Sequence, residues 1–449
     1  MMRKPGGIER TAPGGVFLAF LLALSGPPAV RGRFTSDSLH FTKFTSDKSG
    51  EFLVKINAKA EGTSWERPGR ECAALAISID GHYDQHLFLL HGALQAEYRV
   101  LIGPLSAGEH TLEISWDRAW ARDLDDAPVI NHVELGELNR SDPSLEPLLR
   151  APILYLRKDT LGTFRAMPLV LYREAEGSSR ISYTVIFSGE EGGTGDERLM
   201  ARWGRTTDIR WCYSFSRNGP ESGESFAARN EHSLPFHGEH DGSHPRLYGA
   251  PGSNHFSDRT SDTATVRLRM APVEATIRNT SRESVMDQYP WTYLTMAREL
   301  EREGKMESPG DPRTARISDP RNYAYIEVCA QQRGTEIYFD MLLRGQPRWY
   351  SSDHSDAYSR IERSGCFRSA IELPPGTRTD DLQLLRIHCL PAALPEDGKP
   401  MSSPRAEILS VNKVFFLTQD YRPGENLLDR TLKTRINPGR SLAIEFQHR

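Results

Sequence analysis

Apolar residues recur at every second position along most of this 449-residue chain, and this period constrains the fold more than any other feature. Such residues lie on one face of a strand, which is typical of a half-buried antiparallel sheet. The chain is therefore predicted to be mainly β, with several antiparallel sandwich or jelly-roll-like domains. The alternating sets are Phe52, Val54, Ile56 and Ala58; Leu75, Ile77 and Ile79; Leu112, Ile114 and Trp116; Ile181, Tyr183, Val185 and Phe187; Ile209, Trp211, Tyr213 and Phe215; Ala324, Ile326 and Val328; and Leu442, Ile444 and Phe446.

One segment, near residues 290–304, strongly predicts an α-helix. Pro290 suits a first helical turn, and Leu294, Ala297 and Leu300 follow at helical spacing. Glu299 is expected on the solvent-facing side of this helix. A shorter helix is expected over 196–201.

The length predicts two to four domains at about 150 residues per domain. We expect a signal peptide over 1–32, an N-terminal β-sandwich over 33–140 and a C-terminal β-sandwich over 313–449. Between the two sandwiches we expect a central β domain over 141–308, which contains a long histidine-rich loop and the helix near 290–304.

The first 32 residues have the order of a secretory signal peptide. Arg3, Lys4 and Arg10 precede an apolar run at 16–24, which is too short to span a bilayer, and Pro27 and Pro28 follow it. We therefore expect a secreted or periplasmic protein, with an uncleaved membrane anchor as the alternative. No later apolar run reaches the length of a span, so no membrane span is expected after signal removal.

Charge and cysteine content limit the partners and the redox setting. The net charge is −4, and it is more negative without the basic leader, so the protein lacks the electrostatic footprint for binding nucleic acid. The five cysteines form no C-x-x-C pair. One disulfide is expected among Cys329, Cys366 and Cys389 in an oxidising compartment, with its pairing left open; buried free thiols are the alternative.

Histidines gather between residues 232 and 255. Within this window, His237, His240 and His244 are candidate ligands of a divalent metal ion, and His237 is also a candidate base. Pro235 and Gly238 exclude the helix that would place these rings on one face, so a loop would have to bring them together. The alternative is a hydrophilic loop with solvated histidines.

Two further segments carry candidate chemistry. An acidic loop contains Glu190 and Glu191 beside a run of glycines, and paired carboxylates can divide into acid and base; a solvated turn is the alternative. The segment 202–211 then combines two indoles, three guanidiniums and one carboxylate. Arginine suits carboxylate recognition and tryptophan offers a flat face to a sugar, so this composition indicates an acidic glycan. The alternative is a core tryptophan covered by arginine stems.

These segments give a specific set of site predictions. Asp208 and Glu191 are the candidate acid and base. The substrate would be bound by Arg202 and Arg205 as anion clamps and by Trp203 and Trp211 as platforms. We expect the acidic loop, the 202–211 segment and the histidine-rich region to meet around one hollow of the central domain.

Two resemblances accompany these patterns. One hairpin, at 103–114, resembles the entry to a late strand in galactose-binding-like and carbohydrate-module jelly rolls. The middle region resembles the β-domain of vacuolar-sorting-related proteins, although that family's Gly-Asp-Trp-Glu strand is replaced here by the sequence at 207–211. This resemblance implies a β-sandwich-like fold and no settled activity. Its matching motifs are Ala151-Pro152-Ile153-Leu154-Tyr155, His244-Pro245-Arg246-Leu247-Tyr248 and Gly252-Ser253-Asn254-His255.

Two functional hypotheses follow. The first is a secreted protein that binds or processes extracellular polysaccharide through its central domain, as a hydrolase or lyase if it is an enzyme. The second is a non-catalytic envelope or interaction protein.

Overall fold

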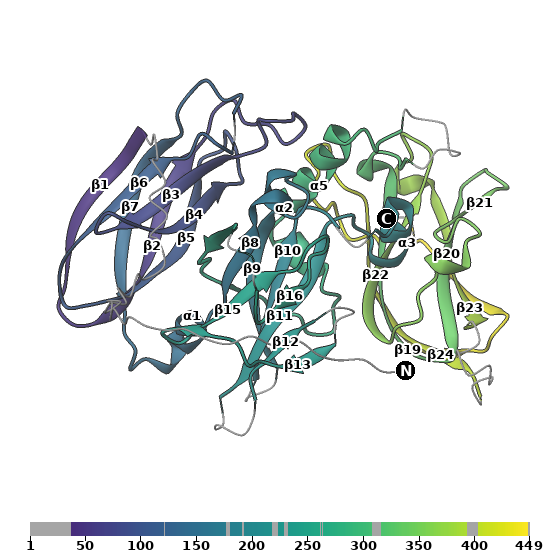
Figure 1. Cartoon of the computed structure of the whole chain (residues 1–449). Coiled ribbons are helices and arrows are strands. Elements are labelled where there is room, and N and C mark those ends of the chain that lie inside the picture. Colours follow the sequence, from purple (N-terminus) through teal and green to yellow (C-terminus); the bar gives the residue numbers. More distant parts are fainter. Residues whose placement is uncertain are drawn as a thin grey trace, which may run out of the picture. The chain divides into compact units, whose positions relative to one another are not determined.

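The computed structural model describes residues 37–120, 122–176, 180–190, 193–217, 223–228, 232–260, 262, 264–307, 316–392 and 403–447. The chain from Ser36 onward forms one compact unit. This unit is mainly β and is built from several mostly antiparallel sheets, which confirms the fold class (Figure 1). The predicted signal peptide and Glu191 lie outside the described residues, and the predicted domain limits stay predictions.

Residues 37–138 form two sheets that share one core. Their strand orders are β1-β6-β3-β4 and β5-β2-β7. The alternating residues predicted from the sequence, such as Val54, Leu75 and Ile114, are fully buried between these sheets. At the hairpin between β3 and β4, Asp80 and Gly81 both have positive φ, which a tight two-residue turn requires. The strands are β1 (Asp37–Ser46), β2 (Gly50–Lys59), β3 (Ala73–Ile79), β4 (His82–Leu89), β5 (Ala96–Leu105), β6 (Gly108–Trp116) and β7 (Val129–Leu138).

The middle of the chain forms two more sheets. One has the order β13-β12-β11-β10-β9-β18, and the other has the order β14-β15-β8-β17, with β16 paired to β15. The strands are β8 (Ile153–Arg157), β9 (Pro168–Glu176), β10 (Arg180–Phe187), β11 (Asp208–Ser216), β12 (Ser225–Ala227), β13 (Ser233–Pro235), β14 (His240–Asp241), β15 (His244–Gly249), β16 (Phe256–Ser257), β17 (Thr265–Leu268) and β18 (Val273–Glu274).

This middle part differs from the sequence prediction in two ways. β8 pairs in parallel with β15, so that Tyr155 lies opposite Tyr248, and β9 pairs in parallel with β18. The histidine-rich region, expected to be a long loop, contains the short strands β12 to β16. Edge pairing satisfies the backbone of these short segments without the alternating pattern that identifies a longer strand.

Short helices pack among these sheets. They are α1 (Glu146–Leu149), α2 (Lys158–Gly162), α3 (Asp196–Trp203), α4 (Ser284–Gln288) and α5 (Trp291–Arg302). α5 confirms the helix predicted near 290–304, and Pro290 immediately precedes it. The expectation for Glu299 was wrong: it is buried, because the face formed by Thr292, Thr295, Met296 and Glu299 is packed as well. Burial raises the pKa of Glu299 well above its usual value.

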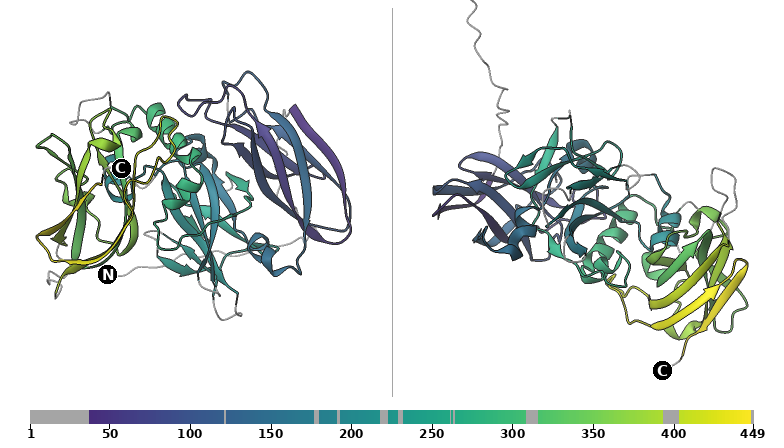
Figure 2. Two further views of the ribbon diagram at one scale, coloured as in Figure 1. Left: turned by 180° about the vertical axis from the view of Figure 1, so that it is seen from behind. Right: turned by 90° about the horizontal axis from the view of Figure 1, so that it is seen from below.

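Residues 323–445 form a second sandwich. Its strands are drawn in green to yellow in Figure 2. Its sheets have the orders β22-β19-β24-β25 and β21-β20-β23-β26 and enclose their own core. A disulfide joins Cys329 on β19 to Cys366 on β22, whereas Cys389 is a buried thiol. The strands are β19 (Tyr323–Arg333), β20 (Thr335–Leu343), β21 (Trp349–Ser351), β22 (Gly365–Glu372), β23 (Leu382–Pro391), β24 (Arg405–Phe415), β25 (Arg430–Ile436) and β26 (Arg440–Glu445). None of the helices in the described ranges is long and apolar enough to cross a membrane.

Candidate functional site

A cavity of about 270 Å³ lies where α3, the start of β11 and the segment before β22 come together. We call it the arginine cavity. It brings together Trp203, Arg205 and Asp208 from the 202–211 segment and Glu190 from the acidic loop. Two of the three segments that we expected to meet therefore do so. Its charged lining residues are Arg205, Arg210, Arg282, Arg363, Glu190, Asp208 and Glu283.

The end of α3 sets the position of Trp203. Gly204 has a φ of +60°, a left-handed conformation that ends the helix, and the chain then turns into β11. A Cβ at Gly204 would lie 3.0 Å from Cγ of Arg368, so the close packing there also requires glycine.

Asp208 holds the loops around the cavity together. Its Oδ2 accepts hydrogen bonds from Nε of Arg210 at 2.7 Å and from Nδ2 of Asn254 at 3.0 Å. Nδ2 of Asn254 also donates to the carbonyl oxygen of Gly189 at 2.8 Å. The 252–255 motif thus links the acidic loop to the start of β11. Since the Asp208 carboxylate is buried and bound by donors, it acts as an anchor for Arg210.

Arg205 is paired with a second carboxylate of the cavity, that of Glu283. Its Nε lies 3.1 Å from Oε1 of Glu283, and Nη1 donates to the carbonyl oxygen of Thr207. Burial alone would raise the pKa of Glu283. The guanidiniums of Arg205, Arg363 and Arg368 outweigh that effect and hold this pKa below its usual value. Glu283 is therefore ionised and positions Arg205.

Arg363 brings a guanidinium with an unused donor to the cavity. Its guanidinium lies 5.3 Å from the centre of the Trp203 ring, and that of Arg202 lies 5.2 Å from the same ring. Its Nη2 donates to the carbonyl oxygen of Arg202, whereas Nη1 is buried and has no hydrogen-bond partner among the described atoms. Burial lowers the pKa of Arg363 to about 10; Glu283 opposes this shift, and Arg202 and Arg205 add to it. A negative charge nearby would relieve this crowding of guanidiniums.

Two of the predicted substrate-binding residues do not line the cavity. Arg202 lies beside it and donates from Nη1 to the carbonyl oxygen of Tyr358 at 3.0 Å. Trp211 is half-buried on β11, where it lies opposite Thr184. Of the two predicted tryptophans, Trp203 lines the arginine cavity and lies beside the guanidiniums of Arg202 and Arg363, whereas Trp211 does not line it.

The histidine-rich region reaches the arginine cavity only through Asn254, which binds Asp208, and none of its histidines lines the cavity. Nε2 of His244 lies 3.1 Å from Oε2 of Glu51, and its Nδ1 lies 2.7 Å from the carbonyl oxygen of Ala151. His240 pairs with Glu224 at 3.0 Å, and His237 is exposed. Across the described residues, no group of three or more His, Cys, Asp or Glu side chains could hold a metal ion. The three candidate ligands are thus not brought together, and His244 instead fixes β15 to β2.

The pair of His240 and Glu224 gives a prediction about acid stability. The hydrogen bond between Glu224 and His240 is the main reason that the pKa of Glu224 falls to about 2. Because this value lies below the unfolded value of about 4, the pair stabilises the fold above that pH, and the effect is lost as the pH falls toward 2. The variant E224Q should lower the free energy of unfolding by about 1 kcal/mol at neutral pH.

Urea unfolding followed at several pH values checks this expectation. The difference between wild type and E224Q should shrink as the solution is acidified. E239Q is the matched control, because Glu239 is 76% exposed and its bond to Arg246 is at the surface. Equal effects of the two substitutions at neutral pH would contradict the prediction.

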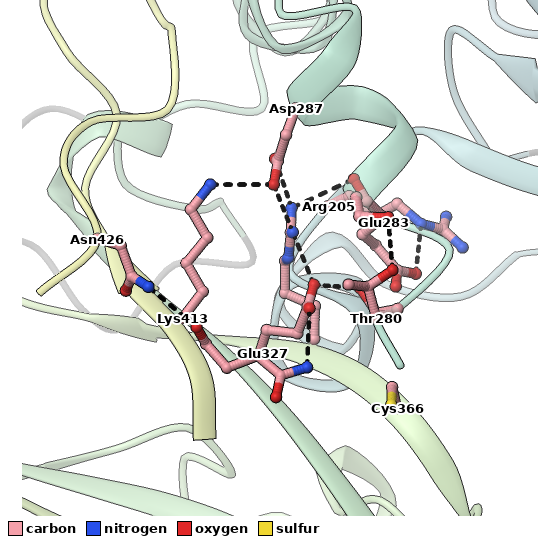
Figure 3. Close-up of polar contacts among 12 residues, drawn as sticks. Arg205, Thr280, Glu283, Asp287, Glu327, Cys366, Lys413 and Asn426 are labelled. Carbon is pink, nitrogen blue, oxygen red and sulfur yellow. Dashed lines mark hydrogen bonds and ion pairs between the residues drawn. The ribbon is translucent and has the colours of Figure 1, made fainter. Parts of the chain in front are cut away.

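A network of buried ion pairs lies next to the cavity (Figure 3). The sequence analysis did not predict this network. Arg368 on β22 is fully buried, and its two Nη atoms bind the two carboxylate oxygens of Asp287 at 2.9 and 2.8 Å. Nη2 also binds Oε2 of Glu327 at 2.8 Å. Lys413 lies 3.1 Å from Asp287 on a further side. The network ties α4 to β19, β22 and β24, and Glu283 connects it to the arginine cavity.

Comparisons with known proteins add little to this geometry. No family model and no curated protein matches the chain. The resemblance of the middle region to vacuolar-sorting-related proteins therefore stays a resemblance. Among solved structures, the chain is similar to the C-terminal domain of EclA, a sugar-binding protein, with 10% identity and a TM-score of 0.18. That match covers 22% of this chain and 68% of the other, and at this TM-score it carries no argument.

Proposed function

We propose that this protein binds an acidic saccharide and that the arginine cavity receives a carboxylate group of the sugar. The observation that carries this proposal is the convergence of four guanidiniums on one cavity beside Trp203, with three carboxylates to balance them. Arg205 and Arg210 are already held by Glu283 and Asp208. Arg363 retains a buried nitrogen with no acceptor among the described atoms, so the cavity favours an anion.

The size and lining of the cavity support a sugar as the carrier of that anion. A volume of about 270 Å³ is at the lower end of small-molecule sites, which suits a single sugar unit at the end of a chain. Guanidiniums give bidentate hydrogen bonds to a carboxylate, and Ser364 and Thr194 add polar groups to the lining. An extracellular polysaccharide is the source that fits the predicted signal peptide, so secretion is part of this proposal.

Binding is favoured over cleavage by the state of the carboxylates. A general acid of a glycosidase needs a raised pKa, so that it is protonated at working pH. The pKa of Glu283 is lowered, and Asp208 accepts hydrogen bonds from Arg210 and Asn254. Both groups are thus engaged in holding the cavity. The candidate roles of Asp208 and Glu191 as acid and base remain predictions, and no metal ion is part of this proposal.

The variant R363Q tests the proposal. Titration calorimetry with a short oligogalacturonate should show binding to the wild type and a loss of at least about tenfold in affinity for R363Q, because one charge-assisted hydrogen bond is worth about 1.5–3 kcal/mol. The matched neutral galacto-oligosaccharide should bind at least tenfold more weakly than the acid. Raising the salt concentration should weaken the binding of the acid.

The control variant is R386Q. Arg386 also lies over a tryptophan, 3.7 Å from the centre of the Trp349 ring, but in the C-terminal sandwich and not at the cavity. R386Q should bind the acid like the wild type. Equal affinity for the acidic and neutral sugars would overturn the proposal and leave the interaction-protein hypothesis. New reducing ends or unsaturated products in the same mixtures would show that the protein also cleaves the glycan.

A further inference from the structure

A second cavity, of about 360 Å³, has a different chemistry. We call it the aromatic cavity. Residues of β4 and β5 and the segments 168–171 and 268–271 line it. Aliphatic side chains provide most of its lining, and the aromatic rings of Phe88, Tyr98, Tyr289 and Trp291 complete it. It shares no lining residue with the arginine cavity.

Backbone pairing gives this cavity a fixed shape. The amide of Leu101 donates to the carbonyl oxygen of Arg269 at 2.8 Å, and the amide of Ala271 donates to that of Arg99 at 3.1 Å. The segment 269–271 therefore extends the sheet at β5. A site walled by paired strands loses little conformational freedom when a ligand binds, which favours affinity.

His91 supplies an unused hydrogen-bonding group at the edge of the cavity. Its ring lies 4.4 Å from that of Trp291 and 5.6 Å from that of Tyr98, as measured between ring centres. Its backbone amide donates to the Tyr98 hydroxyl at 3.0 Å, and its ring nitrogens make no hydrogen bond to the described residues. Burial lowers the pKa of His91 to about 4, so the ring is neutral at physiological pH. It can therefore both donate and accept a hydrogen bond.

Each guanidinium of this lining has a carboxylate beside it. Nε of Arg99 lies 2.7 Å from Oε1 of Glu97. The Arg269 side chain is fully buried, donates from Nη1 to the carbonyl oxygen of Gly103, and lies 3.8 Å from Asp84; its Nε and Nη2 have no hydrogen-bond partner among the described atoms. These two nitrogens can donate to a neutral oxygen of a ligand, whereas a charged ligand would lose its hydration beside cations that already have a counter-charge. An uncharged ligand meets no such penalty.

We propose that the aromatic cavity binds an uncharged molecule with an apolar ring system and one hydroxyl or carbonyl group, and that His91 makes the hydrogen bond to that group. The apolar rings and aliphatic walls bury the ring system, and the neutral imidazole selects its polar group. This inference is independent of the proposed saccharide binding, because the two cavities have different linings and opposite preferences for charge.

The experiment uses 2-naphthol as the probe and 2-naphthoate as its charged counterpart. Titration calorimetry on the full chain should show one naphthol site, with naphthoate binding at least about tenfold more weakly. The variant H91F keeps a ring beside Trp291 but removes the hydrogen bond, and it should weaken naphthol binding about fivefold to tenfold.

Two further variants keep the test decisive. A271F places a larger side chain at the cavity wall and should abolish naphthol binding, whereas L94A should have no effect, because Leu94 is 65% exposed and does not line this cavity. All variants should retain the binding of oligogalacturonate shown by the wild type. Naphthol affinity unchanged in both H91F and A271F, equal binding of naphthol and naphthoate, or no naphthol binding to the wild type would each overturn the proposal.

Discussion

Replacing Arg368 with methionine is expected to lower the free energy of unfolding by about 3–5 kcal/mol, one of the two largest effects that we predict. The Arg368 side chain is fully buried, and its Nη atoms donate to Asp287 and Glu327. Methionine fills much of the same volume but leaves two carboxylates without their main counter-charge. Breaking a buried ion pair on one side has this cost because the remaining charge stays desolvated.

The size of this loss of stability depends on the contacts that Asp287 and Glu327 retain in R368M. Asp287 keeps Lys413 at 3.1 Å and the Tyr293 hydroxyl at 2.7 Å. Within the described part of the chain, the remaining partners of Glu327 are the neutral donors Ser281 Oγ at 2.7 Å and Asn412 Nδ2 at 3.4 Å. Glu327 is therefore the carboxylate that R368M leaves buried without a counter-charge. Adding E327Q to R368M should recover part of the lost stability, since a buried amide needs hydrogen bonds but no counter-charge.

Urea unfolding followed by tryptophan fluorescence measures these differences. The matched control is R344M, because Arg344 is exposed and its loss should change stability by less than about 0.5 kcal/mol. A loss below about 1 kcal/mol for R368M, or a double variant less stable than R368M, would contradict the role of this network.

The sequence predicts the sandwich cores well, because a strand imposes its period on its own residues. Val54 and Ile56 follow that period and lie fully buried in the core, as do Leu75 and Ile114. Parallel pairing of β8 with β15 could not be predicted in this way, because it joins residues about ninety positions apart and leaves no local signal. The burial of Arg368 was missed for the same reason. Its partners lie on α4 and β19, and the residues next to Arg368 in the sequence do not predict them.

The part of the arginine cavity that the sequence predicts is the local part. Phe187 lies opposite Asp208 in the pairing of β10 with β11, so residues 188–207 connect two neighbouring strands. Antiparallel pairing places the end of β10 next to the start of β11, so Glu190 and Asp208 lie close together. Trp203 of α3 lines the same cavity. Arg282 and Arg363 enter from distant segments and could not be found from spacing. The histidines lie close in sequence, yet His240 on β14 and His244 on β15 face different carboxylates.

Removing the disulfide is expected to cost roughly 3–4 kcal/mol of unfolding free energy, because it closes a loop between positions separated by 37 residues. In the double variant C329A/C366A the unfolded chain regains the freedom that this loop closure removes. The folded chain changes less, since the β19–β22 ladder already places Cys329 opposite Cys366. Cys366 lines the arginine cavity, but alanine keeps its backbone in the ladder, so the loss should appear mainly in stability and only weakly in the geometry of the cavity.

The contacts of Arg363 explain why its cavity should survive this change. Nε2 of Gln332 donates to the Arg363 carbonyl oxygen at 2.8 Å, and the backbone N–H of Gln332 donates to Oγ of Ser364 at 2.8 Å. These bonds hold the segment before β22 in place without the sulfur bridge. We therefore expect C329A/C366A to bind oligogalacturonate within about threefold of the wild type, well short of the tenfold loss expected for R363Q.

Urea unfolding with and without dithiothreitol separates the two states of this bridge. Reduced wild type should match C329A/C366A, and the double variant itself should be insensitive to the reductant. C389A is the control: Cys389 is a buried free thiol, so its truncation leaves a small cavity that costs about 1 kcal/mol, and the difference caused by dithiothreitol should persist. A reduced wild type as stable as the oxidised protein would show that the ladder alone holds β19 and β22 together, and that loop closure contributes nothing measurable to this fold.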